Sequence, residues 1–257
     1  MTDLNKAVHE MNLYLENCPE KGRPGFRLKT VHTYHVMRNA GIIAEAMRLS
    51  EEDIQLAKLI GLLHDIGRFE ELIRTGMLAN ERFDHGMCGA QMLFEDGMIR
   101  RFIEEDTYDE IIRKAIVNHN RFHIEEGLNE RELLHAKLIR DADKLDNFRV
   151  KIDEPIHEIF PGRISSIEEI NASCVSENVM KSIRKRQCVD VHDRLTPLDY
   201  MICIVGFVFD FNFDVTKKIV RDEKLAEKFL ERITCINEKG KEQMREITDI
   251  TLAFLAG

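Results

Sequence analysis

The segment LLHDIGR (Leu62–Arg68) decides the fold, because it places an adjacent histidine and aspartate at the end of an apolar helical stretch. Ser50–Asp53 has the spacing of a capping box and predicts the start of that helix. Ile54, Gly61 and His64 recur at helical spacing, so His64 should point inward. Asp65 lies about 100° further round the same helix and can share a cation with His64. Taken alone, the pair also fits a core histidine beside an aspartate at a helix end.

The composition indicates a protein that folds around a sizeable core. The chain has 257 residues, of which 44% are hydrophobic. A formal net charge of -9 argues against a surface for duplex nucleic acid or for anionic membranes. No secretory signal and no run of about 20 apolar residues is present, so we expect no membrane partner. The six cysteines form no CxxC pair, and we expect reduced thiols in a cytoplasmic protein.

Helical patterns account for most of the chain, and no alternating pattern is strong enough to build a sheet. We therefore expect an all-α fold in one domain over residues 1–257, with an irregular connection at 151–166. The expected helices are 3–18, 27–49, 51–65, a short turn at 69–73, 87–95, 107–119, 129–143, 166–186, 197–211, 214–222 and 223–255 with a break near Gly240.

Histidines also interrupt apolar faces elsewhere in the chain. His35 continues the face that begins with Leu28 and Val31 and ends with Ile42. His32 lies off that face, and we expect it to be a supporting or partly exposed residue. His119 completes another apolar face, and the capping-box spacing that begins at Thr107 predicts the start of its helix. 

Two more ionisable residues occupy positions suited to metal ligands. His85 follows Asp84 at a helix start, where the helix dipole disfavours an imidazolium and keeps a lone pair available. Asp143 ends a buried face four residues after Ile139. Asp141 and Asp146 lie off this face, so we expect them to cap or to bind backbone. Each residue alone fits a satisfied core or cap position, but one shared metal would provide partners for all of them.

These residues together carry a resemblance to a known family. They match the H...HD...H...H...D signature of the HD-domain metal-dependent phosphohydrolases, and HDIGR (64–68) and RDADKLD (140–146) resemble two of its sequence blocks. The resemblance implies an HD-domain helical bundle over about residues 26–150, followed by a helical extension over about 151–257. It also implies one cation held by His35, His64, Asp65 and Asp143, and a second held by His85 and His119, with Asp65 bridging.

The donor set and the resemblance indicate the chemistry. Imidazole nitrogen with carboxylate oxygen suits one or two ions of Fe, Mn, Zn, Co or Ni. We expect hydrolysis of a phosphomonoester or phosphodiester of a small molecule such as a nucleotide, by attack of a metal-bound hydroxide with Asp65 bridging. Arg68 is the first candidate to hold a phosphate oxygen and Lys144 the second, although each also fits a structural ion pair. Asn118, Asn120 and Arg121 flank His119 and are candidates to face the substrate.

Two other functions fit the same residues. The first is a di-iron oxygenase on the same fold, which an anaerobic assay would separate from a hydrolase. The second is a catalytically silent module that binds a ligand or a metal. The sequence lacks the GYP block of the related cyclic-dinucleotide phosphodiesterases, and it shows no further catalytic or regulatory domain of the kind found in alarmone hydrolases.

Overall fold

The computed structural model describes residues 3–78 and 82–257, and every regular element among them is helical. The all-α expectation is therefore confirmed. The chain divides into two compact units, Met1–Asp146 and Asn147–Gly257. Helix α8 (Glu130–Asp153) continues through this boundary. That the two parts form one domain stays a prediction.

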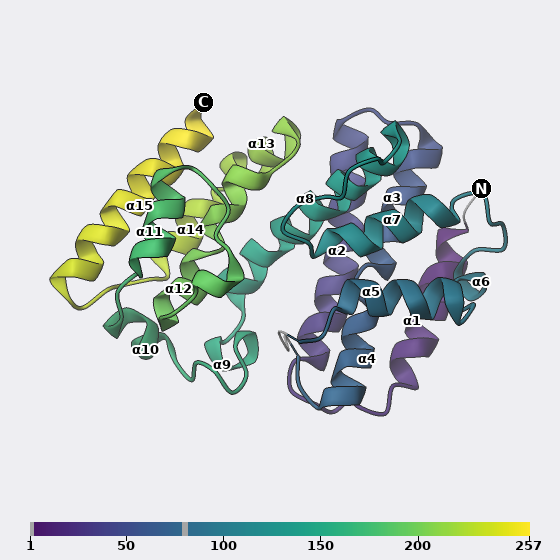
Figure 1. Ribbon diagram of the computed structural model, residues 1–257, viewed down its shortest axis with the longest axis horizontal. Helices are drawn as coiled ribbons and strands as arrows, with labels where there is room; N and C mark the ends of the chain where they lie inside the picture. The colour runs from purple at the N-terminus through teal and green to yellow at the C-terminus, as the bar shows by residue number, and fades with distance from the viewer. Residues whose placement is uncertain (1–2, 79–81) are drawn as a thin grey trace. The chain divides into compact units, whose positions relative to one another are not determined.

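The first unit is built from helices that alternate with short connections. Its elements are α1 (Leu4–Glu16), α2 (Phe26–Ala46), α3 (Glu51–Leu63), α4 (Ile66–Thr75), α5 (His85–Ala90), the π-helical turn η1 (Gln91–Glu95), α6 (Ile99–Phe102), α7 (Asp109–His119) and the first part of α8. Helix α3 packs against α1, α2 and α7, and α5 packs against α4 and α7 (Figure 1). Residues 79–81, which follow α4 in the chain, lie outside the described part of the chain.

The junction between α3 and α4 carries the histidine–aspartate pair. Ser50 caps α3, since its Oγ accepts the Asp53 N–H at 3.1 Å, which confirms the predicted helix start. Helix α3 ends at Leu63, and the predicted short turn at 69–73 is the longer helix α4. His64 and Asp65 therefore lie at the bend between two helices, where successive side chains can diverge.

Helix α2 does not bury the face predicted for it. Ile42, placed on the inward face by the sequence pattern, is 38% exposed, whereas Val36 and Ile43 are fully buried. Close packing against α3 selects the observed face: a Cβ on Gly61 would lie 2.8 Å from the Met37 Cα. The capping box expected at Thr107 is also absent, because α7 begins after Tyr108 without a side-chain cap.

The second unit contains the remaining helices. They are the end of α8, α9 (Ile156–Ile159), α10 (Ile167–Ala172), α11 (Glu177–Arg184), η2 (Val191–Asp193), α12 (Pro197–Ile202), η3 (Val205–Asp210), α13 (Asp214–Asp222), α14 (Leu225–Glu231) and α15 (Glu238–Ala256). Thr196 and Asp199 form a capping box at α12. The break predicted near Gly240 occurs at 232–237, and the single helices expected at 166–186 and 197–211 are each divided in two.

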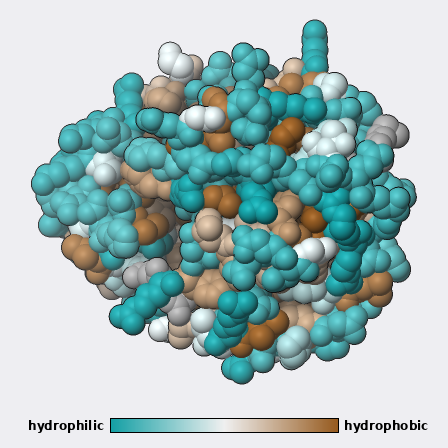
Figure 2. Space-filling view, turned by 45° about the vertical axis from the view of Figure 1, so that its right-hand side comes forward, coloured by the Kyte–Doolittle hydropathy of each residue, from teal (hydrophilic) through white to brown (hydrophobic). Residues whose placement is uncertain are grey.

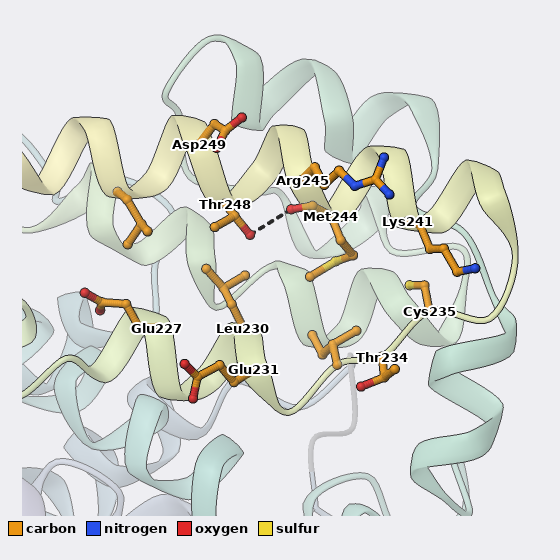
Figure 3. A pocket seen from close by; sticks show the side chains of 12 residues that line it. Glu227, Leu230, Glu231, Thr234, Cys235, Lys241, Met244, Arg245, Thr248 and Asp249 are labelled. Atoms are coloured by element: carbon orange, nitrogen blue, oxygen red, sulfur yellow. Dashed lines mark hydrogen bonds between the residues drawn. The ribbon is translucent and has the colours of Figure 1, made fainter.

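A hollow of about 730 Å³ lies between α14 and α15 in the second unit. Leu230 and Met244 face each other across it, with Glu227 near one end and Lys241 near the other (Figure 3). No histidine lines it. It therefore lacks the imidazole nitrogens of the predicted metal-binding donor set, although it contains carboxylates.

The surface is mainly hydrophilic on the face shown in Figure 2, where hydrophobic side chains appear only in small patches between polar ones. Within the described residues, no helix combines the length and the apolar character needed to cross a bilayer.

Candidate metal centre

Side chains that could hold a metal ion form two groups in the first unit. In each group the ligand atoms all lie within 4.8 Å of one another. The first group draws on α2, the α3–α4 junction and α8, and the second on that junction, α5 and α7. The first group is His32, His64 and Asp143, and the second is Asp65, His85 and His119.

Asp65 connects the two groups, because its two carboxylate oxygens face different histidines. Oδ2 lies 3.7 Å from the His32 Nε2 and 3.6 Å from the His64 Nε2. Oδ1 lies 3.4 Å from the His85 Nε2 and 3.6 Å from the His119 Nε2. One carboxylate can therefore contribute an oxygen to each of two adjacent cation positions.

Backbone carbonyls orient two of the imidazoles. The His64 Nδ1 lies 2.7 Å from the Gly61 carbonyl oxygen, and the His119 Nδ1 lies 2.6 Å from that of Ile116. A carbonyl only accepts hydrogen bonds, so each Nδ1 carries the proton and each Nε2 presents its lone pair. The His64 Nε2 is buried and has no hydrogen-bond partner. A buried lone pair held in this way fits a cation, and such support is typical of metal-bound histidine.

Burial keeps two histidines neutral. It lowers the pKa of His64 to about 4. Burial also holds the pKa of His85 well below its usual value, and the nearby Arg68 adds to this effect. Both imidazoles are therefore uncharged at neutral pH, which is the form that binds a metal.

The carboxylates are ionised despite their burial. Burial favours the neutral form of Asp65, but Lys29 and the surrounding imidazoles outweigh it and hold the pKa of Asp65 well below its usual value. The pKa of Asp143 is also lowered, because its interactions with His32 and His64 outweigh burial. Burial and Lys29 favour neutral His32, yet Asp143 and Asp146 outweigh them and raise its pKa.

The donor chemistry fits one or two divalent transition-metal ions. The two groups supply four imidazole nitrogens and two carboxylates, a mixed set that suits Fe, Mn, Zn, Co or Ni better than Ca or Mg. The inward-facing His64 Nε2, which has no hydrogen-bond partner, supports the same assignment.

The structure corrects the prediction for His35. The His35 side chain is 40% exposed, and its Nδ1 lies 3.5 Å from the Asp146 Oδ1, so it joins neither group. His32 lies in its place and is only 2% exposed. The error follows from the wrong choice of buried face on α2. The structure brings the other predicted ligands together: His64, Asp65, His85, His119 and Asp143.

Asp146 has a different role from the capping or backbone role expected for it. Its Oδ2 lies 2.6 Å from the His32 Nδ1, so the carboxylate accepts a hydrogen bond from that nitrogen. This contact directs the His32 Nε2 toward Asp143, whose Oδ1 is 3.0 Å away. The sequence did contain a signal for this pairing. Two histidines three residues apart, His32 and His35, are matched by two aspartates three residues apart, Asp143 and Asp146.

The predicted catalytic cations lie close to the ligands. The Arg68 Nε is 3.8 Å from the Asp65 Oδ1, and its Nη1 donates to the buried Glu71 at 2.7 Å. Lys144 follows Asp143 in α8 and is 7% exposed. Lys29, which no sequence pattern indicated, donates to the Asp65 Oδ2 at 2.7 Å.

The segment after His119 is held in place by several polar contacts. The Arg140 guanidinium donates to the backbone carbonyls of Asn118, Arg121 and Phe122. Asn118 is buried, and its side chain bonds backbone groups. It therefore stabilises this segment and does not face solvent. The exposed Asn120 donates to Asp84 at 3.1 Å and so connects the end of α7 to the start of α5.

Comparison with known proteins agrees with this geometry. A model of the HD domain family matches residues 30–147, a range that contains all six grouped residues. No curated protein and no solved structure gives a significant match to the chain. Residues 30–147 therefore belong to the HD-domain superfamily, whose members are generally metal-dependent phosphohydrolases.

Proposed function

We propose that this chain is a metal-dependent phosphohydrolase that cleaves a phosphomonoester or phosphodiester of a nucleotide-like small molecule. The observation that carries the proposal is the position of Asp65, whose two oxygens each face a different pair of histidines at 3.4–3.7 Å. A carboxylate shared in this way is the arrangement that two adjacent cations need.

The ligand residues would form two adjacent cation sites. His32, His64 and Asp143 would hold one cation, His85 and His119 would hold the other, and Asp65 would contribute to both. Two bound divalent ions lower the pKa of water and neutralise charge that develops on a phosphoryl group. Asp146 and the Gly61 and Ile116 carbonyls would keep the imidazoles in the required tautomers.

Arg68 is our first candidate to bind the phosphate. Its side chain is 17% exposed, and its Nε, which has no hydrogen-bond partner, lies 3.8 Å from the Asp65 Oδ1. Glu71 fixes the other end of the guanidinium through Nη1. The planar group is thus held beside the ligands with a donor available for an anion. We propose Lys144 as a second cationic residue for the same substrate.

Two exposed apolar side chains support an organic group on the substrate. Met87 is 48% exposed and follows His85 by two residues, while Phe122 is 47% exposed and follows His119 by three. The Arg121 Nη2 lies 3.8 Å from the Met87 Sδ, which brings the two segments together. Aromatic, thioether and guanidinium groups all stack on flat rings, so this surface suits a nucleobase.

The cysteine chemistry agrees with a cytoplasmic setting for this activity. None of the six cysteines forms a disulfide, which is the usual state in a reducing compartment.

The first test combines metal analysis with an assay. Protein purified without chelator should contain a transition metal and should release phosphate from members of a panel of phosphomonoesters and phosphodiesters. His64→Ala and Asp65→Ala should lose both properties while keeping their helical circular dichroism. His9→Ala, which changes an exposed histidine in α1, is the matched control and should keep both.

The alternative functions give different results in the same experiment. Hydrolysis should continue without oxygen, so turnover that requires O₂ would instead identify an oxygenase. Protein that contains no metal and whose melting temperature does not change when Mn²⁺ is added would contradict the proposal and favour a catalytically silent module.

A further inference from the structure

A lysine occupies the side of the bridging carboxylate where a cation would bind. Lys29 is the fourth residue of α2, three residues before His32, and its Nζ lies 2.7 Å from the Asp65 Oδ2. The same oxygen faces the Nε2 atoms of His32 and His64. The lysine side chain is 21% exposed, whereas that of Asp65 is 3% exposed. Lys29 therefore connects the buried ligands to solvent.

This position is unfavourable for metal binding alone. A fixed positive charge repels a cation that approaches the same oxygen, and the repulsion is large where water is excluded. Metal-bound carboxylates are usually held by further hydrogen bonds, and a neutral donor would orient Asp65 without this penalty. Metal binding alone therefore does not explain why a lysine lies beside the Asp65 Oδ2.

An anionic substrate does account for it. A cation bound to Asp65 would weaken the hold of this carboxylate on Lys29, and the ammonium could then bind a second anion. The three carboxylates that face the histidines, Asp65, Asp143 and Asp146, leave one positive charge when two divalent ions are bound. Lys29 raises this sum to two. Arg68 adds nothing to this net charge, because the buried Glu71 balances it, although the guanidinium can still donate to a phosphate. The sum does not include Lys144, the second cationic residue proposed for the substrate.

We propose that Lys29 is a specificity-determining residue that binds a non-bridging phosphate oxygen and selects phosphomonoester dianions over phosphodiester monoanions. This inference rests on the proposed phosphohydrolase function and adds the charge of the substrate. An ammonium interacts about twice as strongly with a dianion as with a monoanion at the same distance. The selection follows from that difference.

The test compares two lysines that are similarly exposed and that each form an ion pair with a carboxylate. Lys29→Met removes the charge, and Lys58→Met is the matched control, since its Nζ lies 2.8 Å from the Glu45 Oε1 and its side chain is 24% exposed. Each variant is loaded with Mn²⁺, whose affinity is measured by electron paramagnetic resonance. Kinetic constants are measured for p-nitrophenyl phosphate, a dianion, and bis-p-nitrophenyl phosphate, a monoanion. Calorimetry measures the affinity for inorganic phosphate.

Lys29→Met should bind Mn²⁺ as tightly as the unmodified protein or more tightly. Its KM for the monoester should rise about tenfold, as expected for one lost charge-assisted hydrogen bond. Its KM for the diester should rise only about threefold, because the interaction energy lost with a monoanion is about half as large. The affinity for inorganic phosphate should fall by about the same factor as the monoester KM rises. Lys29→Arg should restore monoester binding, and Lys58→Met should change none of these quantities.

If Lys29→Met binds Mn²⁺ more weakly and its KM rises equally for both esters, the inference is overturned. Lys29 would then only support Asp65. If the unmodified protein binds Mn²⁺ but hydrolyses neither ester, the proposed function fails. The phosphate titration then still decides the role of Lys29: unchanged phosphate affinity in Lys29→Met would refute it.

Discussion

His32 and Asp146 form a buried pair in which the Nδ1 of the histidine lies 2.6 Å from the Oδ2 of the aspartate. The contact joins α2 to α8 and determines which histidine of α2 reaches the candidate metal centre. His35 touches the same carboxylate only at 3.5 Å and from a more exposed position.

The two histidines of α2 should therefore respond differently to substitution. His32→Ala should abolish Mn²⁺ binding at the first group of ligands, because it removes one of three donors. His35→Ala should keep metal binding and activity within about twofold, since surface substitutions cost little. Metal titration and phosphate release on both variants check this prediction. Loss of metal in His35→Ala with retention in His32→Ala would reverse the assignment.

Asp146 should affect the metal without binding it. Asp146→Asn keeps the shape of the side chain but removes the charge that holds His32 in its tautomer. Mn²⁺ affinity should fall by about 10–100-fold, the usual effect of changing a residue that supports a ligand. The far-ultraviolet circular dichroism should not change. An affinity equal to that of the unmodified protein would show that His32 needs no such support.

Gly67 should be required for the position of His85. A Cβ at Gly67 would lie 2.1 Å from the His85 carbonyl oxygen and 2.8 Å from the Gly89 nitrogen, both of which are backbone atoms. Gly67→Ala should therefore push α4 away from α5, lower the free energy of unfolding by about 1–3 kcal/mol and weaken metal binding. Gly22→Ala is the control, because nothing lies within 4 Å of its added Cβ. Urea denaturation and metal titration measure both effects.

Asp53 should make stability depend on pH in the acid range. Burial favours its neutral form, but hydrogen bonds from His135, Ser50 and Arg131 outweigh burial and lower its pKa from 3.8 to about 2. Because the folded-state pKa is the lower one, this contribution is complete above the unfolded pKa of 3.8 and is lost as the pH falls through about 2.

Asp53→Asn should lower the free energy of unfolding at pH 7 by about 1–2 kcal/mol, a figure reduced for partial exposure. It should also flatten the dependence of stability on pH between the two pKa values. Glu51→Gln, in the same helical turn but exposed, is the control and should have little effect. Urea denaturation at several pH values gives the comparison, and identical pH profiles for Asp53→Asn and the unmodified protein would contradict the prediction.

Phe122 should matter only for substrates that carry a flat ring. Phe122→Ala should raise the KM for a nucleoside monophosphate several-fold, because stacking on the exposed ring is worth about 1 kcal/mol or more. The KM for glycerol phosphate should not change. Ile42→Ala removes another exposed apolar side chain, 38% exposed on α2, and should leave both constants unchanged. Equal effects on both substrates would count against base stacking.

The division of the chain into helices could largely be predicted from its sequence. The apolar periodicity and the cap at Ser50 identify the elements, because these signals depend on neighbours within a few residues. The breaks inside the expected helices at 166–186 and 197–211 depend on contacts between helices and were not predicted.

Most of the candidate centre also followed from sequence. The HD pair, His85, His119 and Asp143 interrupt or begin helical segments in a distinctive order, so they could be named before any coordinates were known. The choice between His32 and His35 could not be made in this way. Residues three apart on a helix are separated by only about 60° around its axis, so either histidine is compatible with the same periodic pattern.

The sequence alone therefore determined the all-helical fold class and the residue types that make a metal centre, because helical periodicity and donor chemistry are local properties. Only the tertiary structure decided which face of α2 packs against α3, that Asp65 faces both groups of ligands, and that Lys29 and Asp146 contact them. These features depend on distances between residues as far apart in the chain as His32 and Asp146. Packing sets such distances, and no local pattern contains them.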